Sequence, residues 1–224
     1  MEYALQDNIA TISFDDGKAN AVGVEFLKAI NNALDKAEAE KASAVILRGR
    51  EGMFSGGFDL KEFEKGIEAG MAMAKSGFEL LLRLYSFPLP VVAACTGHGI
   101  AMGAFIIMAS DYRIGTLGSY KISLPETRIG MELPPTLMGL TESRISPRHL
   151  TRVALLSEVY SPENAVDAGF IDEAVEYADL EAKAIEAATT MAQLPQAQFV
   201  QNKLAIRATT LETMRAGIAQ MSLR

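Results

Sequence analysis

The sequence contains a single cysteine, Cys95, and only two histidines, His98 and His149. One cysteine cannot form an internal disulfide, and it fits a reducing cytoplasm better than an oxidising compartment. These three side chains lack the spacing of a zinc site, so we expect no bound metal. Apolar runs are short as well. None reaches the roughly 18 residues that a membrane-spanning helix requires, so we expect no membrane partner.

Positive charge is scarce. Lys and Arg number 21 against 28 Asp and Glu, which gives a formal net charge of −7 at pH 7. A nucleic-acid surface requires clustered Lys and Arg to meet the phosphates, so we expect no nucleic-acid partner. The start of the chain has no basic segment followed by an apolar stretch, which argues against a secretory signal peptide. An anionic small molecule stays compatible with this charge if its cations are placed locally.

Strand and helix patterns alternate along about the first two thirds of the 224 residues. Residues 9–14 alternate as a half-buried strand, and residues 24–39 place apolar side chains on one helical face. Short apolar strands follow at residues 44–47 and 91–95, and a helix is expected between them over residues 70–85. This alternation predicts an α/β fold.

The pattern after residue 146 is mainly helical. Ser161, Pro162 and Glu163 open one of these helices, with a serine cap and a proline at the first helical position. We therefore divide the chain into an α/β core of residues 1–145 and a helical C-terminal region of residues 146–224. The boundary allows a second interpretation, in which the helical region extends one continuous core.

One pattern occurs twice: a buried strand enters a glycine-containing loop, and the loop opens a helix. The two loops are residues 54–61 and residues 97–103. N–H groups at helix N-termini have no intrahelical partner, so two converging ends would form a two-donor hole for a carbonyl oxygen that gains negative charge. Each junction alone is more typical of a tight turn, and neither matches a phosphate-binding loop.

Several segments, in this order, resemble the crotonase (enoyl-CoA hydratase/isomerase) family. The first loop, FSGGFDLK, is similar to the family's F-S-[AG]-G-x-D-[LI]-K, and the second loop with its helix is similar to the family's second glycine signature. Shorter similarities are KANA at residues 18–21, LPETRIG at residues 124–130, and the stretch at residues 161–172. Together they extend from residue 9 to about residue 175, and their common order is far more specific than any one of them.

The resemblance implies a crotonase-like spiral of ββα units with a helical C-terminal region. It further implies that the chain assembles into trimers or hexamers through that region. It also implies a CoA thioester as the substrate, with no separate cofactor. By position in the motifs, the backbone N–H groups of Phe58 and Met102 would bind the thioester oxygen, and Glu126 would be the acid/base. The same motifs place further residues at the substrate: Ala19, Ser55, Gly56, Gly57, Asp59, Lys61, Gly99, Gly103, Phe105 and Pro125.

The departure from the family pattern is Phe105, where typical hydratases carry a second glutamate that helps to split water. Phenylalanine neither accepts nor donates that proton. A dry site with one base suits moving a proton from C2 to C4 of an enoyl chain, so the resemblance favours a 3,2-enoyl-CoA isomerase of fatty acid metabolism. Two alternatives stay open: a 2-enoyl-CoA hydratase that uses Glu126 with another group, and a non-catalytic acyl-CoA-binding trimer.

Among four other polar residues, Glu132 and Lys61 have two interpretations each. Glu132 is a candidate second carboxylate, although a surface loop is the more common place for such a residue. Lys61 would either face the CoA phosphates or lie solvated in a first helical turn. We expect His98 to make a loop hydrogen bond and His149 to lie on a solvated helix. Apolar residues of the helix at residues 70–85 would line an acyl pocket: Met71, Met73, Phe78, Leu81 and Leu82.

Overall fold

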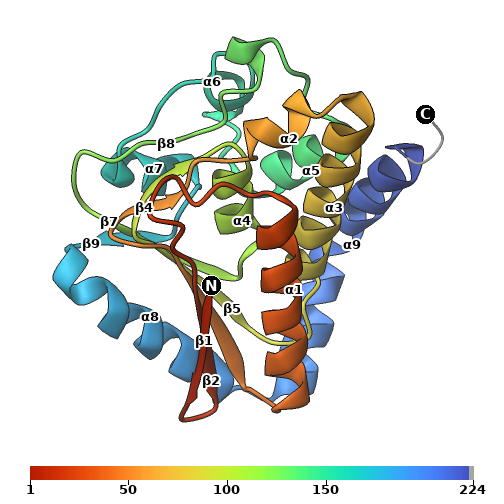
Figure 1. Cartoon of the computed structure of the whole chain (residues 1–224). Helices are drawn as coiled ribbons and strands as arrows, with labels where there is room; N and C mark the ends of the chain where they lie inside the picture. Colours follow the sequence, from red (N-terminus) through yellow and green to blue (C-terminus); the bar gives the residue numbers. More distant parts are fainter. Residues whose placement is uncertain (222–224) are drawn as a thin grey trace.

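A computed structural model describes residues 1–221 of the chain, and it consists of four successive strand–strand–helix units wound as a spiral (Figure 1). The first two units are β1 (Glu2–Gln6), β2 (Ile9–Ser13) and α1 (Val24–Ala39), then β3 (Ala44–Arg48), β4 (Gly52–Ser55), α2 (Leu60–Glu64) and α3 (Ile67–Tyr85). The next two are β5 (Val91–Cys95), β6 (Gly97–Ile100) and α4 (Met102–Ala109), then β7 (Tyr112–Thr116), β8 (Ile122–Ser123), the 3-10 helix η1 (Thr127–Ile129) and α5 (Pro135–Arg144). The C-terminal region contains α6 (Leu150–Ala154), α7 (Pro162–Ala168), β9 (Glu173–Val175), α8 (Tyr177–Ala192) and α9 (Gln196–Met221).

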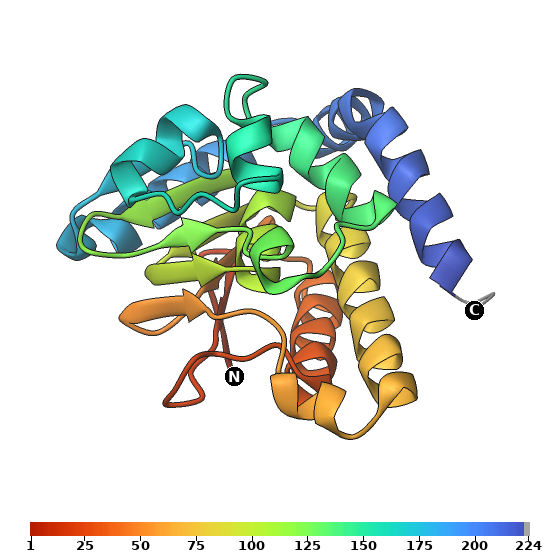
Figure 2. The ribbon, with the colours of Figure 1, turned by 90° about the horizontal axis from the view of Figure 1, so that it is seen from above.

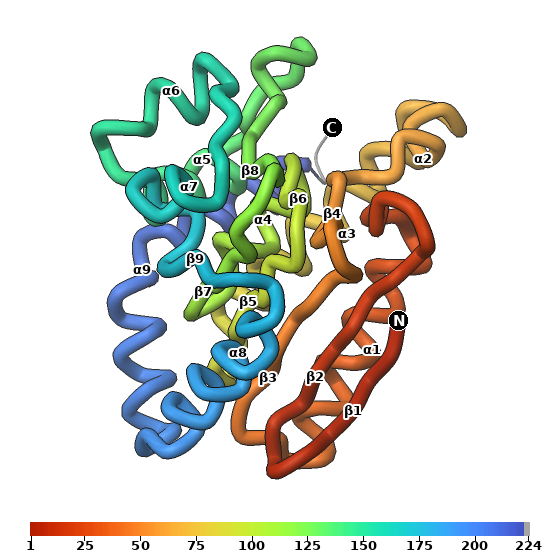
Figure 3. The backbone as a smooth tube through the Cα atoms, turned by 90° about the vertical axis from the view of Figure 1, so that its left-hand side faces the viewer, coloured from red at the N-terminus to blue at the C-terminus, as the bar shows by residue number. Residues whose placement is uncertain are grey.

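The strands form two sheets, and from β3 to β8 successive strands belong alternately to one sheet and to the other (Figure 3). The large sheet has the order β1-β2-β3-β5-β7-β9, and all of its pairs are parallel except β1 with β2. The second strands of the last three units form a small parallel sheet, β4-β6-β8. Because the small sheet is parallel, the loops that leave its three strands emerge at the same edge.

The two faces of the large sheet are covered by different helices, because successive side chains of a strand point to opposite faces. In β3, Val45 and Leu47 belong to the main core, which also contains α1, α3 and α4. The alternate residue Ile46 packs with Leu180 and Ala184 of α8 on the other face. Figure 1 shows α8 lying along that face, away from α1 and α3.

Helix α9 lies beside α5 and α3 (Figure 2). Its second half approaches α5 closely at Gly217, where an added Cβ would lie 2.9 Å from the nitrogen of Thr136. Its first half carries two buried cations, Lys203 and Arg207, which lie 2.7 and 2.8 Å from the carboxylate of Asp111. The ion pairs therefore hold one end of α9 against the core, and the absence of a side chain at Gly217 seats the other end.

The helix and strand patterns of the sequence are largely confirmed. The expected helix over residues 24–39 is α1, the serine cap of α7 accepts the N–H of Asn164, and the helix expected from residue 70 begins at Ile67. The two glycine loops were predicted incorrectly in part. Residues 52–55 and 97–100 are strands, because glycines allow β4 and β6 to pair closely in the small sheet.

The prediction for His149 was wrong. Its ring is buried and lies 3.0 Å from both the Tyr160 hydroxyl and the Asp167 carboxylate. Its two partners lie in later segments of the chain and hold the ring inward. The charged neighbours Arg148 and Arg152 suggest a solvated helix instead. The expected hydrogen bond at His98 is present, since its Nδ1 accepts the N–H of Lys121 at 3.0 Å. Among the helices of residues 1–221, none unites the length and the apolar composition that a bilayer crossing demands.

Candidate active site

A cavity of about 650 Å³ lies where the strands of the small sheet end. It is lined by residues that directly follow β4, by the end of β6 and the start of α4, and by the segment after β8. Carboxyl ends of parallel strands are the usual place for ligand sites in α/β folds. Helices α2, α3, α5 and α9 complete the wall with Phe63, Phe78, Leu137, Gly217, Gln220 and Met221, among others.

Most of the residues predicted for the site line this one cavity: Ala19, Gly56, Gly57, Phe58, Asp59, Met102, Phe105, Pro125 and Glu126. Four others lie outside the lining. Ser55, Gly99 and Gly103 are buried behind it, and Lys61 is exposed on α2. Of the predicted acyl-pocket residues, Met71 and Phe78 line the cavity, whereas Met73, Leu81 and Leu82 are not part of the lining.

The loop after β4 and the start of α4 are in direct contact. A Cβ added to Gly57 would lie 2.9 Å from the Cβ of Ala101 and 3.5 Å from the backbone nitrogen of Met102. A Cβ added to Gly103 would lie 2.8 Å from the Cβ of Ser55. The two glycines therefore let the loops pack backbone against backbone, and Gly57 also has a φ of +105°, which favours glycine. Any larger residue at Gly57 or Gly103 would push the loops apart.

Phe58 and Met102, whose backbone N–H groups are the predicted donors, both line the cavity. Met102 is the first residue of α4, so its N–H has no partner within the helix. Phe58 lies in a parallel bridge with Val22, whose hydrogen bonds use the carbonyl of Gly57 and the N–H of Asp59. The N–H of Phe58 is consequently directed to the opposite side of its strand. This corrects the view that both donors lie at helix ends, because α2 begins only at Leu60, with Asp59 as its cap.

Glu126 presents an unusual carboxylate. Only 6% of the residue is exposed, and within residues 1–221 its Oε2 is the one buried side-chain oxygen or nitrogen without a hydrogen-bond partner. Burial away from water raises the pKa of this carboxyl group to about 7, and one backbone hydrogen bond opposes the rise. A group with this pKa takes up and releases protons near neutral pH, which suits an acid/base role.

The backbone around Glu126 is held firmly by other groups. Its carbonyl accepts the N–H of Met131 at 2.8 Å, and the neighbouring Thr127 hydroxyl donates to the carbonyl of Ala154 at 2.7 Å. Arg128 is tied to Ser157 through its backbone N–H. The carboxylate is thus positioned by the chain on either side of it, and its own oxygen Oε2 stays available to a ligand.

The remaining surroundings are mainly apolar. Phe105 is 1% exposed and lines the same cavity as Glu126, and Phe58 packs edge-on against Phe63. Glu132 is an exposed member of the lining, so a second carboxylate does border the cavity, although not from position 105. The arrangement can bind a carbonyl compound with an apolar body, polarise its oxygen with two N–H groups and exchange a proton with Glu126.

Sequence reasoning missed the contribution of α9. Gly217, Gln220 and Met221 line the cavity, although they lie more than a hundred residues after both glycine loops. No local motif signals such a contact, because it depends on how α9 packs on α5. Asn20, which the motif KANA alone does not mark as a structural residue, is buried, and its amide nitrogen lies 3.1 Å from three backbone carbonyl oxygens.

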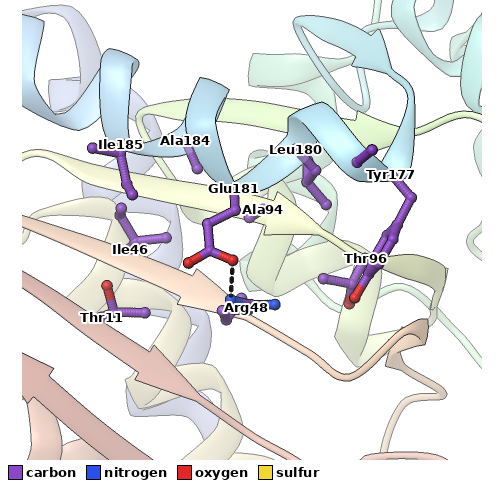
Figure 4. Close-up of a pocket in the computed structure, with 11 residues that line it drawn as sticks. Thr11, Ile46, Arg48, Ala94, Thr96, Tyr177, Leu180, Glu181, Ala184 and Ile185 are labelled. Carbon is purple, nitrogen blue, oxygen red and sulfur yellow. Dashed lines mark hydrogen bonds and ion pairs between the residues drawn. The ribbon is translucent and has the colours of Figure 1, made fainter.

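A second, smaller cavity of about 180 Å³ lies between the large sheet and α8 (Figure 4). Arg48 and Glu181 form an ion pair of 3.1 Å across it, and Ile46, Ala94 and Leu180 line its walls. It lies on the face of the sheet covered by α8, and none of the predicted site residues borders it. Most of the predicted site residues line the cavity at the small sheet instead.

Comparison with known proteins identifies the family. The chain is 30% identical over 191 residues to human mitochondrial enoyl-CoA delta isomerase 1, covering 84% of this chain and 63% of that protein. It is 29% identical over 222 residues to a probable enoyl-CoA hydratase of Bacillus subtilis, covering 96% of this chain and 81% of that protein. A solved structure from Mycobacterium tuberculosis, named an enoyl-CoA isomerase in one determination and a probable enoyl-CoA hydratase in another, has a TM-score of 0.95 and 38% identity, covering 100% of this chain and 97% of that one.

These similarities confirm the crotonase-like α/β spiral expected from the motifs. The relatives carry both isomerase and hydratase names, so the names alone leave the reaction open. A family model described as enoyl-CoA hydratase/isomerase matches residues 4–223, which is nearly the whole sequence. The chain belongs to the enoyl-CoA hydratase/isomerase family.

Proposed function

We propose that the protein is a 3,2-enoyl-CoA isomerase of fatty acid metabolism, with Glu126 as its single acid/base. The observation that carries the proposal is the unpartnered Oε2 of Glu126, buried in an apolar cavity that Phe105 also lines. A lone base in such surroundings can remove a proton and return the same proton, because little water competes for it.

In the proposed reaction the 3-enoyl thioester places its carbonyl oxygen between the N–H groups of Phe58 and Met102. The Glu126 carboxylate takes a proton from C2, and the electron pair moves onto the oxygen as a dienolate. The two N–H groups stabilise that charge, and the loss of one such donor typically costs about 3 kcal/mol of transition-state stabilisation. Glu126 then returns the proton to C4, so the double bond moves from C3–C4 to C2–C3.

Phe105 supports this choice of reaction. Hydration requires a water molecule to be held and split, which is served best by two hydrogen-bonding groups. The Phe105 ring is 1% exposed and offers none, so it occupies volume in the wall without holding water. The cavity of about 650 Å³ is also lined by many apolar side chains, among them Phe105 and Met221, which suits an acyl chain.

Glu132 favours a second candidate, the hydration of 2-enoyl-CoA. It borders the same cavity, and the N–H of Met131, next to it in sequence, is bonded to the carbonyl of Glu126. A water held between the carboxylates of Glu126 and Glu132 would be split in the manner of a hydratase. Glu132 is exposed, however, and an exposed carboxylate is less suited to a dry site.

The test compares the two reactions directly. The pure protein is incubated separately with 3-enoyl-CoA and 2-enoyl-CoA, and the conjugated thioester and the 3-hydroxyacyl product are measured. We expect conjugated thioester from 3-enoyl-CoA and little hydration of 2-enoyl-CoA. Hydration as the faster reaction, abolished by Glu132→Gln, would instead establish the hydratase. Binding of both compounds without turnover would identify a non-catalytic acyl-CoA-binding protein.

A further inference from the structure

The loop that carries the proposed donor Phe58 is built on a neighbouring segment, residues 19–22. The N–H of Gly56 donates to the carbonyl of Ala19 at 2.8 Å, and the N–H of Val22 donates to the carbonyl of Gly57 at 2.8 Å. Next along the chain, the N–H of Asp59 donates to the carbonyl of Val22 at 3.1 Å. These bonds flank Phe58 on both sides, so the path of residues 19–22 determines the direction of its N–H.

Asn20 lies at the centre of this segment and is 1% exposed. Its Nδ2 is 3.1 Å from each of three carbonyl oxygens, those of Phe14, Met53 and Phe54, and its Oδ1 accepts the N–H of Asp16 at 2.9 Å. Both ends of the amide are therefore used. The side chain ties the end of β2 to β4 immediately before the loop begins.

The backbone of Asn20 contributes as well. Its carbonyl accepts the hydroxyl of Ser55 at 2.8 Å, and that same oxygen of Ser55 accepts the N–H of Gly57 at 3.3 Å. Its φ of +49° lies in the left-handed region, which asparagine tolerates better than most residues. Few side chains other than asparagine combine a donor, an acceptor and this backbone conformation.

Asp16 stabilises the turn that precedes Asn20. Its carboxylate accepts the N–H groups of Lys18, Asn20 and Ala21 at 2.7, 2.9 and 3.2 Å. Partial burial acts to raise the pKa of Asp16, but these backbone hydrogen bonds outweigh it and lower the pKa. Asn20 is thus held from one side by Asp16 and itself holds the loop on the other side.

We propose that Asn20 is a positioning residue for the reaction: it sets the direction of the Phe58 N–H through Ser55, Gly57 and the strand β4. Asn20 is not part of the cavity lining, so it acts on the substrate only through this loop. The inference rests on the proposed function, in which that N–H polarises a thioester carbonyl. Misplacement of a reacting group by about 1 Å can cost about 100-fold in rate, so a tilted N–H should lower kcat more than affinity.

The test uses Asn20→Asp, which keeps the shape and the acceptor but removes the Nδ2 donor. The matched control is Asn31→Ala on α1, because Asn31 also bonds a carbonyl, that of Leu27 at 2.8 Å, but lies outside the cavity lining. The readout is the infrared stretching band of the thioester carbonyl in bound, carbon-13-labelled 2-enoyl-CoA. Donation from both N–H groups moves this band to lower frequency on binding.

We expect wild type and Asn31→Ala to show the full band shift. Asn20→Asp should lose about half of it, with kcat for isomerisation down by roughly 10- to 100-fold and KM changed less than threefold. Should Asn20→Asp fail to fold, Ser55→Ala removes the hydroxyl link alone and is expected to reduce the band shift in the same sense. A purely structural role would lower the melting temperature and leave the band of the bound ligand in place.

The outcomes separate two failures. A full band shift and unchanged kcat in folded Asn20→Asp would overturn the role of Asn20 and leave the isomerase proposal intact. No band shift in the wild-type protein would remove the oxyanion hole itself, and with it the proposed function.

Discussion

At the scale of single residues, the unpartnered carboxylate of Glu126 gives the most direct test of the chemistry. We expect Glu126→Gln to lower kcat by about 10² to 10⁴-fold, because the amide keeps the shape but cannot take a proton. Binding of CoA thioesters should survive. In wild type, kcat/KM should rise with pH through about 7, since the ionised form is the base. A variant within a few-fold of wild-type activity would show that another group is the base.

The same pKa makes a prediction about stability. The pKa of Glu126 is raised from 4.5 to about 7, so the fold favours the protonated form. The contribution of the protonated Glu126 to the free energy of unfolding is fully present below about pH 4.5 and is lost as the pH rises through about 7. The loss is on the order of 3 kcal/mol at most. Urea unfolding at pH 5 and pH 8 should show that Glu126→Gln gains stability relative to wild type at the higher pH. An equal difference at both values would contradict the shifted pKa.

Phe105 provides the complementary change. We expect Phe105→Glu to raise hydration of 2-enoyl-CoA relative to isomerisation, because a second carboxylate would share a water molecule with Glu126. The residue is 1% exposed, so an unpaired charge there costs several kcal/mol, and stability must be measured alongside the two activities. Phe105→Leu is the control that opens space without adding charge. A folded Phe105→Glu protein that binds CoA and gains no hydration would show that this position does not separate the two reactions.

At the scale of elements, the sequence pattern predicts the helices and strands that depend on residues close together in the chain. The apolar period of residues 24–39 gave α1, and the motif positions gave Phe58, Met102 and Glu126 in one cavity. The sequence predicts loops in place of β4 and β6 because their glycines weaken a strand pattern, and only pairing with distant strands makes them strands. The place of α9 in the cavity wall depends on packing between distant segments. No single stretch of sequence contains that information.

The packing of α9 on α5 makes a prediction of its own. In Gly217→Ala the new Cβ would lie 2.9 Å from the nitrogen of Thr136. Alanine favours a helix over glycine by roughly 1 kcal/mol, but overpacking costs about 1 to 3 kcal/mol, so we expect a net loss of stability. Displacement of α9 should also widen the cavity at Met221 and weaken its preference among acyl chain lengths. Thr209→Ala, exposed on the same helix, is the control. Unchanged stability and chain-length preference would rule out this contact as a determinant.

At the scale of the whole molecule, we expect assembly as a trimer or hexamer, mainly through the region after residue 146. Leu155, Leu156 and Val159 in that region are 58%, 63% and 43% exposed, and apolar surface of this kind commonly marks an interface. Multi-angle light scattering at micromolar concentration should report the oligomer, and Leu156→Glu should shift it toward smaller species. A stable monomer in wild type would contradict the expectation.

The spiral has a consequence for how such a protein can change over evolutionary time. Its first unit supplies Asn20, the second Phe58, the third Met102 and the fourth Glu126, each from the segment that follows a strand. In the proposed reaction, carbonyl polarisation and proton handling are therefore encoded in separate stretches of the gene. A few substitutions after β8 would then exchange the proposed acid/base group while the two proposed N–H donors stay as they are. Because the chain winds in successive units, a related protein could keep the loops that bind the carbonyl and change only the segment that handles the proton.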